Sequence, residues 1–134
     1  MNQEILDLLD KHPAFLATKG TCGNPRLRPI QSALYYEGKL YFCTSKEKNM
    51  YKHMQNHAGI EICAFDDKET WIRIRGEAKF VESSEVKSKM FAKYPLLKNI
   101  YQNPNNPIFA VFYLEKMSVK IQNFSGREEV IKDS

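Results

Sequence analysis

The chain has 134 residues, which is the length of one domain, and its 43% apolar and 27% charged residues are typical of a folded globular protein. Its net charge of +4 suits an anionic ligand, but it is too small to indicate nucleic acid as a partner. No apolar run reaches the roughly 18 residues that a membrane-spanning helix needs, so we expect no membrane partner.

The first half of the chain predicts one helix followed by strands. Over residues 2–11, Ile5, Leu8 and Leu9 share one helical face, and Pro13 ends the helix because the residue before proline avoids helical dihedrals. We then expect a strand over 15–18, a long strand over 26–36, a hairpin partner over 39–44 after the Glu37–Gly38 turn, and a helix over 46–57.

The second half adds mostly strands. We expect strands over 60–65 and 71–81, a helix from a Ser83 or Ser84 cap to about Tyr94, strands over 109–114 and 117–122 with a break near Glu115–Lys116, and a polar tail over 126–134. Short turns between neighbouring strands favour antiparallel pairing. Six or seven short strands with two or three helices tend to close into a barrel.

The stretch from Tyr41 to Asn49 runs from a strand directly into a helix. Thr44 and Glu47 have the spacing of a capping box, and Ser45 is an alternative cap. The unpaired N–H groups and positive dipole at a helix start attract anions, and two hydroxyls and two lysines gather here, so a phosphate is the natural ligand. The alternative is an ordinary capped helix with solvated lysines.

Two further stretches place arginines on one strand face. Alternation puts Arg26 and Arg28 together, and guanidinium groups bind phosphate through two N–H groups at once. Trp71, Arg73 and Arg75 also share a face, which suits a flat anionic ligand or a subunit contact. The alternatives are a charged edge strand and a sheet with one solvated face.

Other polar residues do not form a recognisable site. His53 and His57 lie four residues apart but lack the glutamate of a zinc-protease motif, so we interpret them as surface histidines. Cys22, Cys43 and Cys63 have no metal-ligand spacing, which predicts free thiols, no metal and a reducing, cytoplasmic location. Because no acid–base machinery is evident, an enzyme of this sequence would need a cofactor.

Four segments in order resemble the pyridoxamine 5'-phosphate oxidase-like family of FMN-binding split barrels, and in particular its short nitroimidazole-resistance-type reductases. The resemblance covers roughly residues 14–122, and its segments are Phe15–Thr18, Gly23–Pro29, Leu40–Ser45 with Lys48 and Asn49, and Trp71–Gly76. It implies a mainly β (α+β) fold, a six-stranded antiparallel split β-barrel with two to three flanking helices, formed by the single domain 1–134. It also implies a homodimer with two FMN molecules at the subunit interface.

The resemblance further implies which residues contact FMN. Arg28 would meet the phosphate or ribityl chain with Arg26 beside it, and Lys48 would be the counter-charge. The full set implied is Arg26, Arg28, Pro29, Ile30, Thr44, Ser45, Lys48, Asn49 and Trp71. The family's arginine- and histidine-containing C-terminal segment for pyridoxal substrates has no counterpart here, so we do not expect oxidation of pyridoxamine phosphate.

The resulting hypothesis is a cytoplasmic FMN-dependent oxidoreductase. Its flavin would accept a hydride from NADH or NADPH and pass electrons to a small acceptor such as a nitroaromatic or a quinone, with no catalytic residue predicted. One alternative is a split barrel that binds haem or the deazaflavin F420, with His53 and His57 as possible haem ligands. The others are a protein that binds FMN without turnover and a small β-barrel that binds single-stranded nucleic acid.

Overall fold

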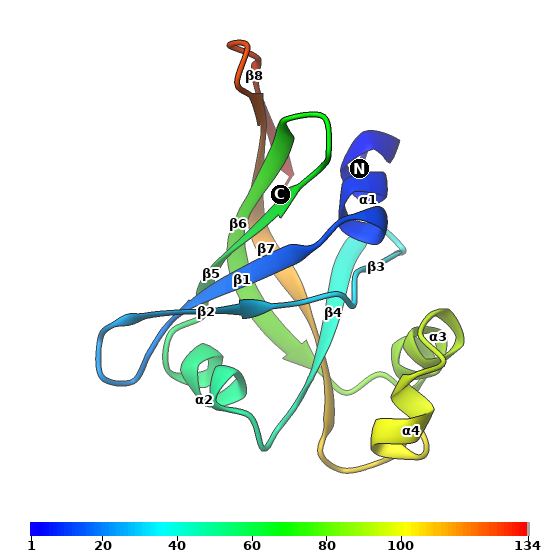
Figure 1. Cartoon of the computed structure of the whole chain (residues 1–134). Helices are drawn as coiled ribbons and strands as arrows, with labels where there is room; N and C mark the ends of the chain where they lie inside the picture. Colours follow the sequence, from blue (N-terminus) through cyan, green and yellow to red (C-terminus); the bar gives the residue numbers. More distant parts are fainter. Residues whose placement is uncertain (134) are drawn as a thin grey trace.

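The computed structural model describes residues 1–133, in which eight strands form one antiparallel sheet with four helices around it (Figure 1). The elements in chain order are α1 (Gln3–Lys11), β1 (Ala14–Lys19), β2 (Pro25–Pro29), β3 (Leu34–Tyr36), β4 (Lys39–Ser45), α2 (Asn49–Asn56), β5 (Gly59–Phe65), β6 (Thr70–Val81), α3 (Ser84–Lys93), α4 (Leu97–Tyr101), β7 (Phe109–Asn123) and β8 (Glu128–Asp133). Among these described helices, none is both long and apolar enough to cross a membrane.

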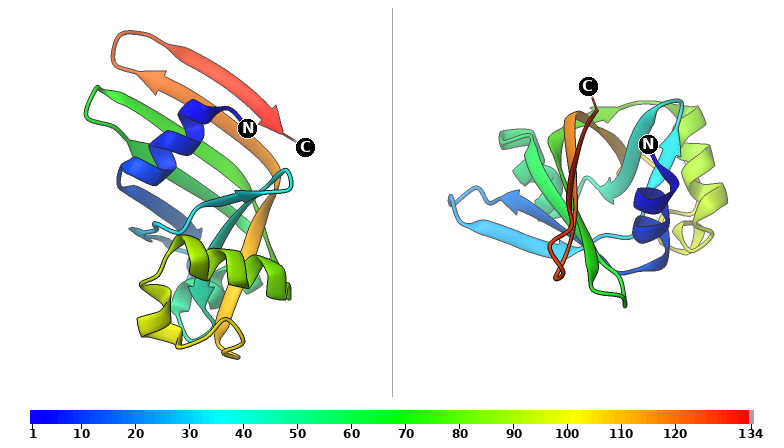
Figure 2. Two further views of the ribbon diagram at one scale, coloured as in Figure 1. Left: turned by 90° about the vertical axis from the view of Figure 1, so that its right-hand side faces the viewer. Right: turned by 90° about the horizontal axis from the view of Figure 1, so that it is seen from above.

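The strand order is β2-β1-β5-β6-β7-β4-β3, and β8 pairs with the second half of β7. Strands β6 and β7 have 12 and 15 residues, and they curve from one half of the sheet into the other (Figure 2). The predicted mainly β, antiparallel fold is therefore confirmed, and its shape is consistent with a split barrel. The described residues contain more strands and helices than the six strands and two to three helices that we predicted.

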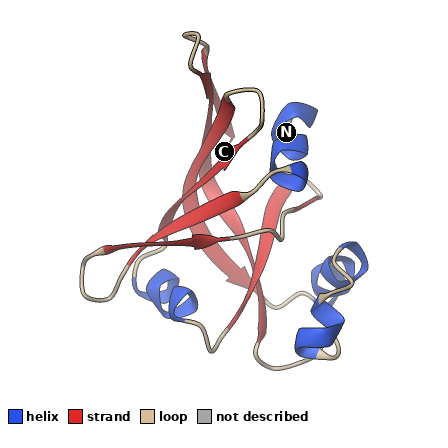
Figure 3. Ribbon diagram, in the orientation of Figure 1, coloured by secondary structure: helices blue, strands red, loops and turns tan. Residues whose placement is uncertain are grey.

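The inner face of the sheet holds the main core. Alternate residues of β1, β5 and β6, among them Leu16, Ile62 and Ile74, are fully buried, and the predicted apolar face of α1 packs on the same cluster. A smaller second core lies where α3 and α4 meet β4 and β7 (Figure 3). Burial of these side chains is the main force that holds the curved sheet together.

The predicted break near Glu115–Lys116 is a β-bulge inside one continuous strand. Arg75 pairs with Ser118 and Glu77 with Glu115, so Gly76 alone faces two residues of β7. Lys116 has a left-handed backbone with φ 51°, which accommodates the extra residue. The bulge increases the local bend, and it lets β7 continue from its pairing with β4 to its pairing with β8.

Two segments differ from the prediction for reasons of hydrogen bonding. The predicted long strand over 26–36 divides into β2 and β3, because Pro29 has no N–H and the pairing with β1 ends at the next amide, that of Ile30, which donates to the Ala14 carbonyl. The Ser32 hydroxyl then replaces a strand partner by accepting from the Cys43 amide at 3.1 Å. The chain therefore crosses between the two ends of the sheet at residues 30–33.

The prediction of a polar tail over 126–134 is wrong for the residues that the structure describes, 126–133. Glu128–Asp133 form β8 against β7, and Ile131 packs against the main core. The alternation is hidden in the sequence because the strand is short and each of its faces carries a single apolar residue, Val130 on one and Ile131 on the other. Ser134, the last residue of the predicted tail, lies outside the described residues.

Replacing Gly76 with alanine is expected to destabilise the protein. An added Cβ would lie 3.0 Å from the Glu115 carbonyl oxygen and 3.2 Å from the Leu114 Cβ, and neither atom can move without opening the bulge. We expect a loss of about 1–3 kcal/mol in the free energy of unfolding, measured by urea denaturation. Gly59→Ala is the matched control, because its Cβ meets only the ring of His57, which can rotate. Equal stability of the two variants would contradict this interpretation of the bulge.

Candidate functional site

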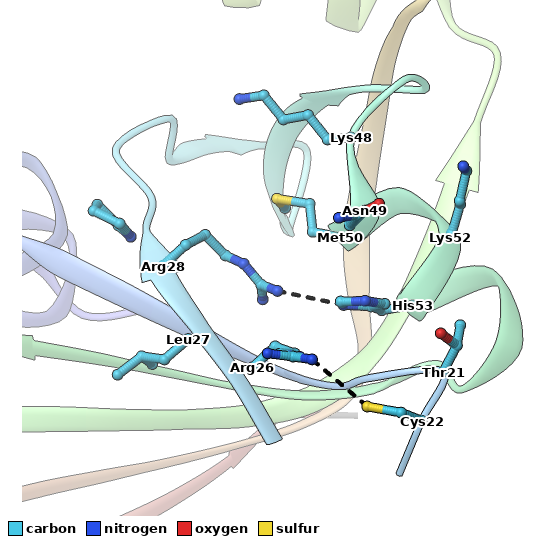
Figure 4. A pocket seen from close by; sticks show the side chains of 11 residues that line it. Thr21, Cys22, Arg26, Leu27, Arg28, Lys48, Asn49, Met50, Lys52 and His53 are labelled. Carbon is cyan, nitrogen blue, oxygen red and sulfur yellow. Dashed lines mark hydrogen bonds between the residues drawn. The ribbon is translucent and has the colours of Figure 1, made fainter. Parts of the chain in front are cut away.

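A pocket of about 570 Å³ lies between β2 and the start of α2 (Figure 4). Its walls come from the turn before β2, from β2 itself, and from the first two turns of α2. The lining residues are Thr21, Cys22, Arg26, Leu27, Arg28, Pro29, Lys48, Asn49, Met50, Lys52 and His53. Two arginines, two lysines and a histidine therefore converge on one cavity, and no carboxylate is among these described lining residues.

Local structure explains why the basic side chains converge. Strand β2 pairs with β1 so that Arg28 lies opposite Leu16 and Arg26 opposite Thr18, and the two arginines share the face toward α2. Helix α2 begins at Asn49, and its N-cap Lys48 makes no side-chain cap hydrogen bond. Its first-turn amides and its positive dipole end are thus next to the arginines.

Arg28 is held by three groups of this chain. Its Nη1 donates to the Leu16 carbonyl oxygen at 3.2 Å and to the Thr18 hydroxyl at 2.8 Å. Its Nη2 lies 3.4 Å from His53 Nδ1, and the Thr18 hydroxyl lies 3.0 Å from the same nitrogen. Arg28, Thr18 and His53, which come from β2, β1 and α2, thus form one hydrogen-bonded cluster at the edge of the pocket.

The pKa shifts reflect burial and the accumulation of positive charge. Burial, followed by repulsion from Arg28 and Arg26, lowers the pKa of His53, so its imidazole is neutral near pH 7. Burial and the neighbouring Arg26 also lower the pKa of Arg28, although an arginine stays protonated. An anion in the pocket would relieve this repulsion, because it would bring the missing negative charge.

Five of the nine predicted cofactor-binding residues lie together in this pocket: Arg26, Arg28, Pro29, Lys48 and Asn49. Ile30 is buried in the main core instead. The Ser45 hydroxyl is occupied, because it accepts from the Glu47 amide at 3.1 Å. The expected capping box does not form, because Thr44 belongs to β4 and the helix starts five residues after it. The Thr44 hydroxyl is buried, and its Oγ1 has no hydrogen-bond partner among the described residues.

Trp71 lies outside the pocket, on the outer face of the sheet. Its ring packs against Phe124 with the centroids 4.9 Å apart, and Phe65 completes an aromatic cluster at the tips of two hairpins. Phe65 and Phe124 are largely exposed. The structure therefore separates Trp71 from the predicted anion-binding residues of its own chain.

The prediction of His53 as a surface histidine is wrong. Only 8% of the residue is exposed, and its ring lines the pocket beside Arg28. One signal in the sequence pointed this way: His53 follows Asn49 by four residues, which places both on the same helical face. Thr18 gave no such signal, because a buried threonine on a strand is common in ordinary cores.

Cys22 at the mouth of the pocket is expected to be the most reactive of the three thiols. Hydrogen bonds from the Asn24 amide and the Arg26 side chain lower the pKa of Cys22, whereas burial raises the pKa of Cys63 and raises that of Cys43 to about 11. Because the thiolate is the reactive form, alkylation by iodoacetamide should begin at a lower pH at Cys22 than at the other two. Peptide mass spectrometry over a pH series measures this order, and Arg26→Leu should move the Cys22 profile to higher pH. An unchanged profile in Arg26→Leu would show that the guanidinium does not act on the thiol.

Comparison with known proteins places the fold. The chain is similar to a NimC/NimA family protein from Clostridium acetobutylicum, with 34% identity over 97% of this chain and 90% of that one and a TM-score of 0.86. It also resembles a protein related to general stress protein 26 from the same organism, with 15% identity over 96% of this chain and 92% of that one and a TM-score of 0.74.

A third structure, a heme binding protein from Mycobacterium smegmatis, shares 18% identity over 90% of this chain and 52% of that one, with a TM-score of 0.71. No curated protein sequence matches the chain significantly. The sequence model described as pyridoxamine 5'-phosphate oxidase matches residues 1–123, which is most of the chain. With this match and the 34% identity above, the chain belongs to the pyridoxamine 5'-phosphate oxidase family.

Proposed function

We propose that this protein is a cytoplasmic flavoprotein that binds FMN and passes electrons from a reduced nicotinamide to a small acceptor, such as a nitroaromatic or a quinone. The observation that carries the proposal is the pocket between β2 and α2, which is lined by four cationic side chains and the neutral His53, with no carboxylate among the described lining residues. The phosphate of FMN is largely a dianion near neutral pH and matches this charge. Membership of the family supports a flavin-type ligand.

The residues present fit the phosphate end of FMN. Arg26 and Arg28 supply planar guanidinium groups that suit phosphate oxygens, and Lys48 and Lys52 supply point charges beside them. Asn49 and the first-turn amides of α2 add neutral donors at the positive end of the helix dipole. When bound, the flavin would supply the redox chemistry, since its ring takes up a hydride and passes electrons on. The chain's own task is to bind and orient this group.

The segment after Arg28 would support the rest of the ligand. Residues 30–33 are anchored at both ends, since the Ile30 amide donates to Ala14 and the Ala33 carbonyl accepts from Tyr94 Oη at 2.6 Å and Lys93 Nζ at 2.7 Å. Gln31 is the exposed residue of this segment, so a flat ring would contact it there, and a segment that is already fixed lowers the entropy cost of such a contact.

We also propose that two copies of the chain pair through the outer face of the sheet. Large apolar side chains remain exposed there, among them Phe15, Phe65, Phe124 and Val130. Arg73, Arg75 and Lys120 lie on the same face, and exposed apolar side chains that are bordered by polar ones are typical of an interaction site. In such a dimer Trp71 would contact the partner rather than the anion pocket of its own chain.

Haem and F420 are the alternative ligands, and binding of FMN without turnover is the alternative role. One of the similar structures is a heme binding protein. Against His53 as a haem ligand, its Nδ1 accepts from Arg28, so the ring proton is on Nε2, the nitrogen that would otherwise be left to bind iron. The three ligands have distinct absorbance spectra, so the same measurement separates them.

The protein is expected to bind about one FMN per chain. The protein is purified under native conditions, FMN is added and the excess is removed, after which flavin absorbance bands should remain. If the protein is an enzyme that oxidises a nicotinamide, NADH or NADPH should bleach these bands. A colourless protein that takes up no FMN would contradict the proposal. A haem or F420 spectrum would show that the cofactor is one of these two and not FMN. Bound FMN that neither nicotinamide reduces would favour the role without turnover.

Arg28→Leu should weaken FMN binding by about tenfold or more, because it removes hydrogen bonds to a charged phosphate. Lys52→Leu should weaken binding less, since a flexible exposed lysine acts mainly as a point charge. Lys98→Leu is the control for the lysine change, because Lys98 is exposed on α4, outside the pocket. Dissociation constants from quenching of flavin fluorescence measure all three, and equal weakening in Lys98→Leu would exclude a specific phosphate site here.

Val130→Asp should disrupt the proposed dimer. Val130 is 52% exposed on the outer face, and a carboxylate there would lose its hydration if two sheets meet, a cost that its cross-strand neighbour Lys120, already paired with Glu128, would offset only in part. Sedimentation should show the wild type at twice the 15.6 kDa chain mass and the variant as a monomer. Ile100→Asp, at a residue that is 57% exposed on α4, is the matched control and should remain dimeric. A monomeric wild type would contradict the pairing.

A further inference from the structure

Arg28 differs from the other well-paired arginines of this protein in the charge of its partners. Arg73 Nε contacts a Glu61 carboxylate oxygen at 3.0 Å, and Arg127 Nη1 contacts Glu4 at 2.8 Å. Arg28 is instead held by a carbonyl oxygen, a hydroxyl and an imidazole nitrogen. All three of these acceptors are neutral when His53 is neutral.

The hydrogen-bond pattern also determines the tautomer of His53. A guanidinium has donors and no acceptor, so the Arg28 contact at 3.4 Å requires Nδ1 of His53 to be the acceptor. The Thr18 hydroxyl receives its own hydrogen bond from Arg28 and can donate its one proton to the same Nδ1 at 3.0 Å. The ring proton of neutral His53 is therefore on Nε2.

A neutral partner and a carboxylate have opposite consequences for an anion site. A carboxylate orients an arginine but cancels its charge, and it competes directly with an incoming phosphate. A neutral acceptor orients the guanidinium and leaves its full charge for the ligand. The cost is repulsion among unpaired cations: burial lowers the pKa values of His53 and Arg28, and repulsion from the neighbouring arginines lowers them further.

We propose that Thr18 and His53 are positioning residues, which hold the Arg28 guanidinium in place with neutral acceptors and so reserve its charge for a phosphate monoester. The site would then prefer a phosphorylated ligand over the same molecule without its phosphate, here FMN over riboflavin. The identity of the flavin rests on the proposed function, whereas the role of Thr18 and His53 toward Arg28 rests only on the contacts above.

The decisive comparison is His53→Gln with His53→Glu. The two side chains have nearly the same shape, and either can accept from Arg28, but only glutamate cancels its charge. We expect His53→Gln to bind FMN within about threefold of wild type, and His53→Glu to bind it at least about tenfold more weakly, the factor that one lost charge-assisted contact supplies. Riboflavin should bind all three proteins equally, because it lacks the phosphate. Thr18→Val, which removes an acceptor, should also weaken FMN binding and spare riboflavin.

Inorganic phosphate, titrated by calorimetry, is the probe that separates this inference from the choice of flavin. If FMN does not bind, but inorganic phosphate binds more weakly to His53→Glu than to His53→Gln, the proposed cofactor is wrong and the role of His53 is supported. If His53→Gln and His53→Glu bind FMN and phosphate equally, His53 is merely structural and the inference is overturned.

A measurement on the wild type covers the case in which a variant fails to fold. Nitrogen-15 NMR of the histidines near pH 7 should show His53 neutral, with its proton on Nε2. A proton on Nδ1 would contradict the hydrogen-bond pattern and overturn the inference without any variant.

Discussion

The antiparallel register between β1 and β2 is the constraint on which the site depends. It places Arg28 opposite Leu16 and Arg26 opposite Thr18, so both guanidinium groups face α2. A slip of one residue would turn both arginines to the outer face and put Leu27 at the pocket, because side chains alternate along a strand. The register is held because the same alternation buries Ile30, two residues after Arg28, in the core, so the position of the arginines is tied to the stability of the sheet.

The two faces of the sheet have different roles. The inner face carries the core and, at its edge, the basic pocket, whereas the outer face exposes aromatic and aliphatic side chains. The long strands β6 and β7 connect both halves, and the bulge opposite Gly76 supplies the bend that lets one sheet serve both purposes. A flat sheet of the same strands would not wrap a core on one side.

The pocket is built at a cost in electrostatic energy. Two arginines and two lysines line it without a carboxylate among the described lining residues, and repulsion from the two arginines adds to burial in lowering the pKa of His53. Such an arrangement is typical of a binding site, since side chains selected only for stability would pair these charges. The neutral cluster around Arg28 shows how one guanidinium is kept in place under these conditions.

Local patterns in the sequence were enough to predict the antiparallel β fold, the α1 face, a helix capped at Ser83 or Ser84, and the shared face of Arg26 and Arg28. Strand alternation, helix periodicity and capping act over a few neighbouring residues, and the structure places the cap at Ser83. The resemblance of this chain to a known family predicted that Lys48 and Asn49 act together with these two arginines, and all four residues line the pocket. Only the tertiary structure brought in His53 and Thr18, which are 35 residues apart in the chain, turned 128–133 into a strand, and separated Trp71 from the pocket. These features depend on pairings between distant segments, and distant pairings leave no periodic trace in the sequence of either segment.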